Sequence, residues 1–184
     1  MGDTVVIKPS SNTPLSVLAL VSVMNEVLPP DVLIAVPGPG ELGARLASHP
    51  DVAKVMFTGS TEVGRRIVES TAGNLARVTL ELGGNDAGIV LPGTDASAIA
   101  QDLFWGAFIN TGQTCAAMKR LYVHDSVYED VVQALAEVAR QTPMGPGLDE
   151  GNVLGPLQNK AQFDTVERLV EDAKAHGGRV VTGG

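Results

Sequence analysis

Cysteine is nearly absent from this chain, which has one thiol, Cys115, among 184 residues. A single thiol cannot form an internal disulfide, so the fold must depend on its hydrophobic core, and a reducing compartment is expected. No apolar run approaches the roughly 20 residues that a membrane-spanning helix needs. The first residues also lack the basic segment followed by an apolar stretch that is typical of a signal peptide. These absences predict a cytoplasmic protein that does not enter a membrane.

Positive charge and histidine are also scarce. Lysine and arginine number 13 against 21 aspartate and glutamate residues, which gives a net charge of −8. Such a balance argues against nonspecific binding of nucleic acid. The three histidines, His49, His124 and His176, lie in turn, strand-end and helix-end contexts and are expected at the surface. A Cys–His protease is therefore disfavoured, and we assign no metal site.

The patterns that are present predict an α/β fold. Hydrophobic residues make up 44% of the chain, and runs typical of strands alternate with helical ones, which favours parallel strands. We place a domain boundary near Gly83–Gly84, so the domains would be 1–83 and 84–184. Strands are expected near 4–7, 32–36, 54–57, 77–81, 88–91, 121–123 and 179–182, and helices near 13–27, 41–48, 60–73, 95–110, 126–140 and 158–176.

Four helix starts carry capping signals. Thr13 precedes a proline, and Ser60 and Asp95 each precede a helical run, so each is expected to be an N-cap. Ser126 is followed three residues later by Glu129, which matches a capping box.

The segment Phe57–Gly64 is a candidate anion site. A strand ends at Phe57, and Gly59 and Ser60 precede a helix, whose first N–H groups can hold a phosphate. The G-x-G-x-x-G fingerprint is absent, so an ordinary capped helix is an equal alternative. Lys8 follows the first strand, where it could donate to a sugar hydroxyl or a phosphate, or could simply be a solvated lysine.

Glu81 and Cys115 are candidates for catalysis. Glu81 ends an apolar strand, where burial would make it a useful general base, although a solvated glutamate is the more common outcome. Cys115 follows a helix end among Gly112, Gln113 and Thr114, small and polar neighbours that suggest access and nearby N–H donors. The alternative is a buried, inert thiol. Without a histidine partner, a Cys–Glu arrangement is the better candidate.

Four segments together resemble the NAD(P)-dependent aldehyde dehydrogenase superfamily. They are Val6–Ser10, Phe57–Gly64, Leu80–Gly84 and Gly112–Cys115. Each is moderately specific alone, but they occur in family order and at similar spacing. The resemblance covers nearly the whole chain and identifies it as an internal part of such an enzyme. It implies an open parallel-sheet nucleotide-binding domain, partial here, followed by the start of an α/β catalytic domain.

The resemblance also implies roles for single residues. Cys115 would attack the aldehyde, and its backbone N–H would form half of an oxyanion hole. Hydride transfer to the nicotinamide would leave a thioester, and Glu81 would activate the water that hydrolyses it. Lys8 would lie at the adenosine ribose, and Ser60, with Gly59 allowing close approach of the backbone, at the pyrophosphate.

The remaining implications concern the cofactor and its surroundings. Leu82 and Gly83 would line the nicotinamide pocket. The family usually has an acidic residue where this chain has Ser11, so both NAD and NADP are expected cofactors. The family's oxyanion asparagine and nicotinamide-ribose residues would lie outside this stretch, and Asn110 does not match the asparagine's position. The parent enzyme would be a homo-oligomer acting on a small-molecule aldehyde.

Two alternatives stay open at this point. The chain could be a catalytically weak nucleotide-binding fragment of such an enzyme. It could also belong to relatives that pass the acyl group to coenzyme A, but Glu81 argues against this because those relatives commonly lack the base.

Overall fold

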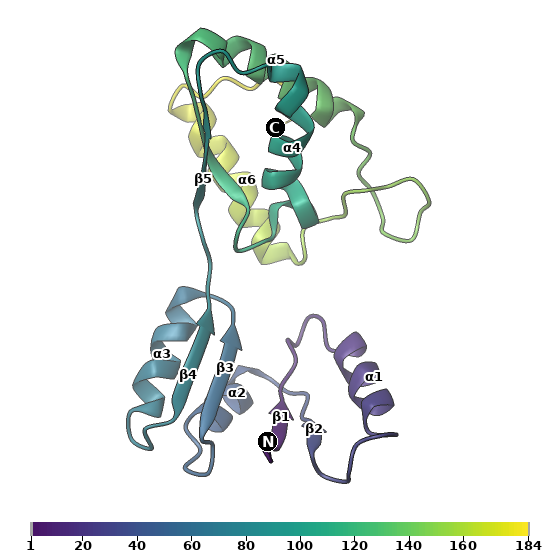
Figure 1. Ribbon diagram of the computed structural model, residues 1–184, viewed down its shortest axis with the longest axis vertical. Coiled ribbons are helices and arrows are strands. Elements are labelled where there is room, and N and C mark those ends of the chain that lie inside the picture. The colour runs from purple at the N-terminus through teal and green to yellow at the C-terminus, as the bar shows by residue number, and fades with distance from the viewer. Residues whose placement is uncertain (1, 184) are drawn as a thin grey trace. The chain divides into compact units, whose positions relative to one another are not determined.

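The computed structural model describes residues 2–183, which form two compact units (Figure 1). The first unit ends at Leu82 and the second begins at Gly83. The named strands all pair in parallel, and every one except β4, which leads into β5, is followed by a helix, so the predicted α/β class is confirmed. Met1 and Gly184, which the predictions included at the two ends, lie outside the described residues.

The first unit contains two parallel strand pairs, each joined through a helix. β1 pairs with β2 over three residues, and β3 pairs with β4 over five. The helices between the paired strands, α1 and α3, are the crossover connections that parallel pairing requires. The elements are β1 (Val5–Ile7), α1 (Leu15–Met24), β2 (Leu33–Ala35), α2 (Gly40–Ala47), β3 (Lys54–Thr58), α3 (Thr61–Thr71) and β4 (Arg77–Glu81).

The second unit is built around one parallel pair and three helices. β5 pairs with β6, with a register shift between Asp86 and Ala87. The α-helices α4 and α5 pack against each other, and their contact supplies much of the core. The elements are β5 (Asp86–Val90), α4 (Ala96–Phe108), the 3₁₀ turn η1 (Ile109–Gly112), β6 (Met118–Val123), the 3₁₀ turn η2 (Asp125–Val127), α5 (Tyr128–Gln141) and α6 (Lys160–Ala175).

Two hydrophobic clusters hold the second unit together. In one cluster, Phe104 of α4 packs with Val138 of α5 and with Leu154 from the loop that follows α5. In the other, Val131 of α5 is 1% exposed and contacts Val90 of β5. Burying a side chain of this size contributes about 1.5–3 kcal/mol to stability. The two clusters fix α4, which precedes the cysteine loop described below, and β5, which pairs with β6, the strand that follows that loop.

Two of the predicted helix caps are confirmed. The Ser60 Oγ accepts a hydrogen bond from the Val63 N–H (3.3 Å), and the Asp95 carboxylate accepts from Ser97 and Ala98 (2.9 and 3.3 Å). The prediction for Thr13 is wrong. Its N–H donates to the Ser10 carbonyl in a turn, and α1 begins at Leu15 with no side-chain cap.

The predicted capping box at Ser126 is also wrong. The Ser126 N–H donates to His124 Nδ1, so His124 provides the side-chain cap of the 3₁₀ turn that precedes α5. Glu129 does not reach back to Ser126, because both of its carboxylate oxygens accept hydrogen bonds from Arg179 at 3.0 Å. Those hydrogen bonds raise the pKa of Arg179 above its usual value.

Among the described residues, the parallel strands of the first unit are hydrogen-bonded as two pairs, β1–β2 and β3–β4. β1 and β2 offer only three residues each, which leaves few backbone groups for a further neighbour. The prediction of a strand near 179–182 is wrong, because that run is not in a strand within the described residues.

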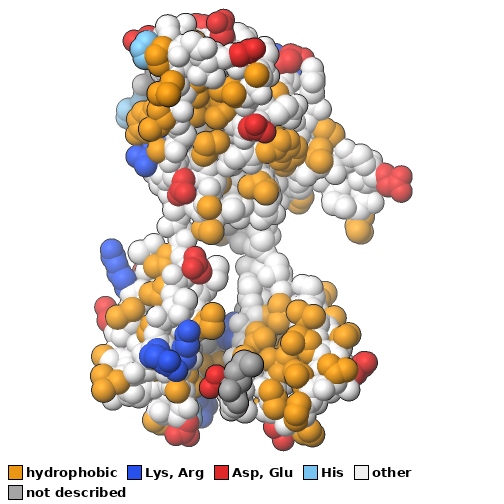
Figure 2. Space-filling model, viewed as in Figure 1, with side chains coloured by type: hydrophobic (Ala, Val, Ile, Leu, Met, Phe, Trp, Pro, Cys, Tyr) orange, Lys and Arg blue, Asp and Glu red, His pale blue; other side chains and the backbone are white. Residues whose placement is uncertain are grey.

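Apolar side chains gather at the surface of the first unit over α1 (Figure 2). Leu15 is 79% exposed there, and Leu20 and Val23 of the same helix are more than half exposed. The three histidines are exposed, as predicted. No helix in residues 2–183 combines the length and the apolar character needed to cross a membrane.

Candidate active site

The predicted anion site lies where β3 leads into α3. Gly59 and Ser60 form the turn, and the Gly64 N–H closes the first helical turn on the Ser60 carbonyl (3.0 Å). The earliest N–H groups of a helix have no partner within it and carry partial positive charge. Glu62 brings a negative charge to this end, but its carboxylate is paired with Arg66. The end of the helix can therefore still receive an anion.

The anion turn and the candidate base share one edge of the β3–β4 pair. Thr58 stands opposite Glu81 in the register, and the next N–H, that of Gly59, donates to the Glu81 carbonyl at 3.0 Å. Gly59 is thus fixed by the same strand end that presents Glu81. The Glu81 side chain is exposed, so the burial that would favour a base is not present within this unit.

Leu82 lies directly over α3. A Cβ added to the buried Gly64 would lie 2.8 Å from the nearer Leu82 methyl carbon, so the absence of a side chain at Gly64 lets Leu82 pack against the helix. The structure thus brings Gly59, Ser60, Glu81 and Leu82 together at the carboxyl edge of one strand pair.

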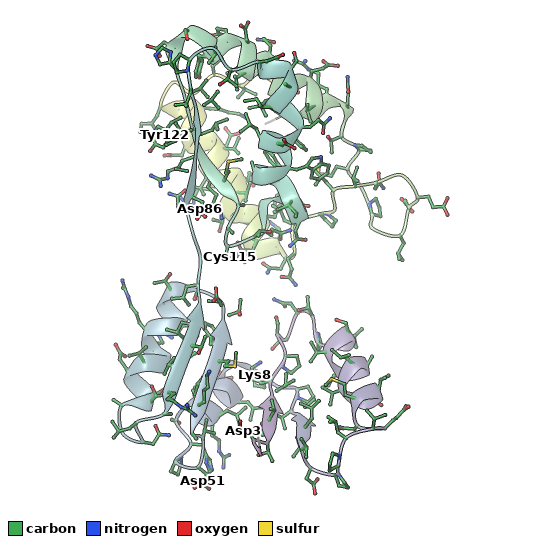
Figure 3. The ribbon with its side chains drawn as sticks, in the orientation of Figure 1. Asp3, Lys8, Asp51, Asp86, Cys115 and Tyr122 are labelled. Carbon is green, nitrogen blue, oxygen red and sulfur yellow. The ribbon has the colours of Figure 1, made fainter. Side chains whose placement is uncertain are left out.

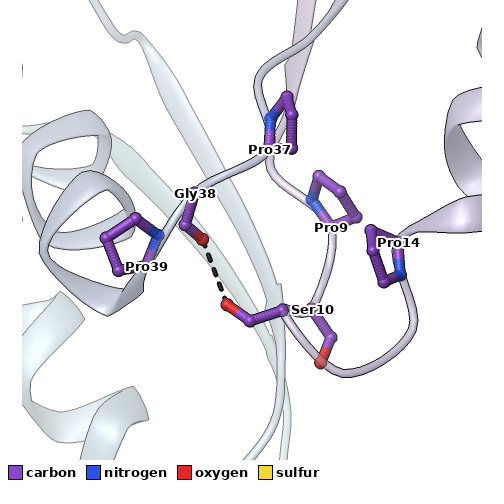
Figure 4. A pocket seen from close by; sticks show the side chains of 7 residues that line it. Pro9, Ser10, Pro14, Pro37, Gly38 and Pro39 are labelled. Carbon is purple, nitrogen blue, oxygen red and sulfur yellow. Dashed lines mark hydrogen bonds between the residues drawn. The ribbon is translucent and has the colours of Figure 1, made fainter.

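Lys8 and Ser11 meet at a different carboxyl edge, that of β1 and β2. The Lys8 Nζ and the Ser11 Oγ both donate to the Gly38 carbonyl, each at 3.2 Å. Figure 4 draws the hydrogen bond to the Gly38 carbonyl as a dashed line, beside a pocket of about 320 Å³. Prolines supply much of its apolar wall, and it is lined by Pro9, Ser10, Ser11, Pro14, Pro37, Gly38 and Pro39.

The Lys8 side chain is held in place along its length. A Cβ added to Gly43 of α2 would lie 3.2 Å from Lys8 Cε, so the lysine stem passes close to that helix. Its ammonium group also donates to the Pro9 carbonyl at 2.7 Å. The charge is therefore kept next to the pocket, where a sugar hydroxyl or a phosphate could take the place of a carbonyl partner.

Cys115 lies in the second unit, on the turn that precedes β6 (Figure 3). The thiol is free and exposed, as the access predicted for it requires. Within the described residues, the Cys115 N–H donates to no other group, so it is available to a ligand. This is the N–H to which the resemblance gives a share of the oxyanion hole.

The backbone leading to Cys115 is unusual. Asn110, Thr111 and Gly112 all have positive φ (51°, 59° and 75°), so three consecutive residues are left-handed. Thr111 is β-branched, for which this conformation is strained, and strain of this kind costs about 1–3 kcal/mol. Contacts elsewhere in the unit must therefore hold the turn in place.

Two of those contacts come from a segment more than 40 residues further along the chain. The Thr111 hydroxyl donates to the Gly155 carbonyl (3.0 Å), and the Gln158 N–H donates to the Gln113 side-chain oxygen (2.8 Å). The Gln113 amide nitrogen donates to the Asn110 carbonyl (3.2 Å). The cysteine loop, residues 109–117, is thus fastened on its N-terminal side to residues 155–158.

Two further residues position the loop from its other side. The Lys119 ammonium donates to the carbonyls of Thr114 (2.7 Å) and Cys115 (3.3 Å). A Cβ added to Gly84 would lie 2.3 Å from the Cys115 carbonyl oxygen, so only glycine fits there. Sequence reasoning did not give Thr111, Lys119 or Gly84 these roles. The Asn-Thr-Gly run was a signal for a left-handed turn, but the other contacts are long-range.

Gly83, a predicted site residue at the start of the second unit, has little around it. It is exposed, and a Cβ added to it would have no atom within 4 Å. Residues 2–183 contain no group of three or more His, Cys, Asp or Glu side chains arranged to hold a metal.

Comparison with known proteins identifies the family. The model of the aldehyde dehydrogenase family matches residues 1–184, and the chain belongs to that family. It is 44% identical to mitochondrial aldehyde dehydrogenase of Leishmania tarentolae, covering 100% of this chain and 38% of that protein.

Two solved structures are similarly close. An NADP-dependent enzyme of E. coli has a TM-score of 0.94 and 40% identity, covering 98% of this chain and 38% of that one. A cysteine-to-alanine mutant of aldehyde dehydrogenase C from Pseudomonas syringae, with NAD+ and octanal, has a TM-score of 0.93 and 36% identity, covering 98% and 38%. The chain therefore spans little more than a third of the length of these relatives.

Proposed function

We propose that this chain carries the nucleophile and part of the nucleotide site of an enzyme that oxidises an aldehyde to a carboxylic acid with NAD or NADP. The observation that supports this most is the cysteine loop. An exposed thiol with an available backbone N–H lies on a strained loop fastened from both sides, in a chain that matches the family throughout. Strain of this kind is typical of functional sites.

In this proposal Cys115 and Glu81 have separate tasks. The Cys115 sulfur attacks the carbonyl carbon of the aldehyde, and the Cys115 N–H donates to the oxygen as it becomes negative. After oxidation, the acyl group is held on sulfur as a thioester. Glu81 takes a proton from the water that hydrolyses the thioester and releases the acid.

The predicted cofactor residues fit a dinucleotide. The pocket beside Lys8 and Ser11 has apolar walls for a ring and hydrogen-bonding groups at its edge. The Gly59–Ser60 turn offers helix N–H groups to a pyrophosphate. Leu82 and Gly83 would line the nicotinamide pocket. The cofactor, when bound, accepts a hydride.

The choice between NAD and NADP depends on Ser11 in this proposal. Its hydroxyl faces the pocket edge and carries no charge, so it would not repel a 2′-phosphate as a carboxylate would. The two similar structures support either cofactor, since one is of an NADP-dependent enzyme and the other contains NAD+.

The wider setting is also part of the proposal. The substrate is a small-molecule aldehyde, as the octanal in one relative suggests, and the parent enzyme is a homo-oligomer in the cytoplasm. The first unit would be the partial nucleotide-binding domain, and the second the start of the catalytic domain. A weak nucleotide-binding fragment and a coenzyme A-acylating enzyme are the alternatives.

A single kinetic experiment separates these readings. The protein at the full length of its relatives is assayed with a panel of aldehydes and with NAD, NADP and coenzyme A, following the reduced cofactor and the acid. We expect acid formation without coenzyme A, and loss of turnover in Cys115→Ala with nucleotide binding retained. Normal turnover by Cys115→Ala would refute the proposal, and dependence on coenzyme A would favour the acylating alternative.

A further inference from the structure

Lys119 makes a contact with the cysteine loop that no role described above requires. Its ammonium group donates to the Thr114 carbonyl at 2.7 Å, and the Ala117 N–H donates to the same oxygen at 3.2 Å. The Thr114 carbonyl and the Cys115 N–H belong to one peptide group. Two donors on the carbonyl therefore fix the plane of that group and the direction in which the N–H points.

The charge on the lysine adds an electronic effect to this orientation. A hydrogen bond from a cation is stronger than one from a neutral donor, and hydrogen bonds in a chain polarise one another. Drawing electron density toward the Thr114 oxygen makes the N–H on the other side of the peptide a better donor. That N–H has no acceptor among the described residues, so the added donor strength is available to a ligand.

We infer that Lys119 is a positioning residue that orients and polarises the Thr114–Cys115 peptide, so that the Cys115 N–H stabilises the negative oxygen formed when the thiol attacks a carbonyl group. The inference rests on the proposed function, because it takes Cys115 as the nucleophile. Lys119 itself does not touch the substrate. It acts through the peptide that it binds.

The expected change in rate follows from the value of an oxyanion donor and from how much a neighbouring hydrogen bond strengthens it. Losing an oxyanion donor costs about 10²–10³-fold in rate, and a neighbouring hydrogen bond strengthens a donor by roughly 10–30%. Removing the Lys119 charge should therefore slow an oxyanion-forming step by about twofold to eightfold. A reaction of the same thiol that forms no oxyanion should keep its rate.

Two cofactor-free reactions of the 184-residue chain make this comparison, and both report on Cys115 alone because it is the only cysteine. With p-nitrophenyl acetate, the sulfur bonds to the carbonyl carbon and the carbonyl oxygen becomes negative. The C–O bond to p-nitrophenolate then breaks, leaving an acetyl thioester, and the thiol proton goes to solvent. With iodoacetamide, the sulfur displaces iodide in one step with no oxyanion.

The variants are Lys119→Met, Lys119→Arg and Lys160→Met. Methionine keeps the length of the side chain without the charge, and arginine keeps the charge. Lys160 pairs with Asp164 on α6, so Lys160→Met is a matched control for losing one positive charge in the same unit. Circular dichroism and thermal unfolding verify that each variant is folded.

We expect Lys119→Met to slow acetylation by about twofold to eightfold and to leave the rate of alkylation unchanged. Lys119→Arg and Lys160→Met should react at rates close to those of the unsubstituted chain in both reactions. Unchanged acetylation in Lys119→Met would overturn the inference. So would an equal slowing of both reactions, since Lys119 would then affect access to the thiol or the fold of the loop. A chain whose Cys115 is alkylated but never acetylated would overturn it as well. The proposed function is tested separately, by aldehyde oxidation in the full-length protein.

Discussion

Gly84→Ala is the substitution for which the structure gives the sharpest expectation. The new Cβ would lie 2.3 Å from the Cys115 carbonyl oxygen and 2.7 Å from a carboxylate oxygen of Asp86. Real Cβ atoms essentially never come closer than 3.0 Å to such neighbours. The Asp86 side chain can rotate away, but the Cys115 carbonyl belongs to the backbone of the nucleophile itself.

The size of the effect follows from the displacement. To reach 3.0 Å, the Gly84 backbone and the cysteine loop must separate by at least 0.7 Å. The loop resists this, because Thr111 and Gln113 fasten it to residues 155–158. Overpacking of this kind costs about 1–3 kcal/mol of stability, and a misplacement of about 1 Å at a reacting group can cost 10²-fold in rate.

Two measurements separate the effect on stability from the effect on the reactivity of the thiol. Thermal unfolding gives the loss of stability, and acetylation of Cys115 by p-nitrophenyl acetate gives the loss of reactive geometry. Gly147→Ala is the matched control, because a Cβ there has no atom within 4 Å and its φ is not positive. We expect the control to retain both properties. If Gly84→Ala kept the original unfolding temperature and acetylation rate, the close approach of Gly84 to Cys115 would be refuted.

Three further predictions concern residues of the first unit. Glu81→Gln in the full-length enzyme should allow a burst of reduced cofactor but lower steady-state turnover by about 10²–10⁴-fold, and a normal steady-state rate would reject Glu81 as the base. Ser11→Glu should shift preference toward NAD by about 1–3 kcal/mol, measured as the ratio of kcat/KM for the two cofactors, and an unchanged ratio would place Ser11 away from the ribose. Ser60→Ala should cost about 1 kcal/mol in denaturant unfolding through loss of the cap, with weaker nucleotide binding by calorimetry, whereas intact affinity would exclude Ser60 from the phosphate site.

The features that were predicted correctly depend on residues that lie only a few positions apart in the chain. β4 was expected at 77–81 and has those bounds, since its β-branched and apolar run is bordered by turn residues. Ser60 and Asp95 cap their helices through N–H groups two or three residues away. Such contacts depend only on local chain geometry, so a pattern can predict them.

Two of the failures come from distant partners. The Ser126–Glu129 capping box was a sound local pattern, but Arg179, 50 residues away, donates hydrogen bonds to both carboxylate oxygens of Glu129. The cysteine loop shows the same limit: Cys115 could be singled out from its neighbours, whereas its supports at Gly155 and Gln158 could not. The catalytic and cofactor roles of the predicted residues remain predictions.

The fastening of the cysteine loop to residues 155–158 also has a consequence for how the protein is made. During synthesis Cys115 is added to the chain 40 residues before Gly155 and 43 residues before Gln158, and it leaves the ribosome ahead of them by the same intervals. At about 5–20 residues per second, the nascent chain spends seconds with Thr111 free to relax out of its left-handed conformation. The thiol is therefore present on the growing chain before the geometry that would make it a selective nucleophile. That geometry forms only after α5 and the loop that follows it have emerged.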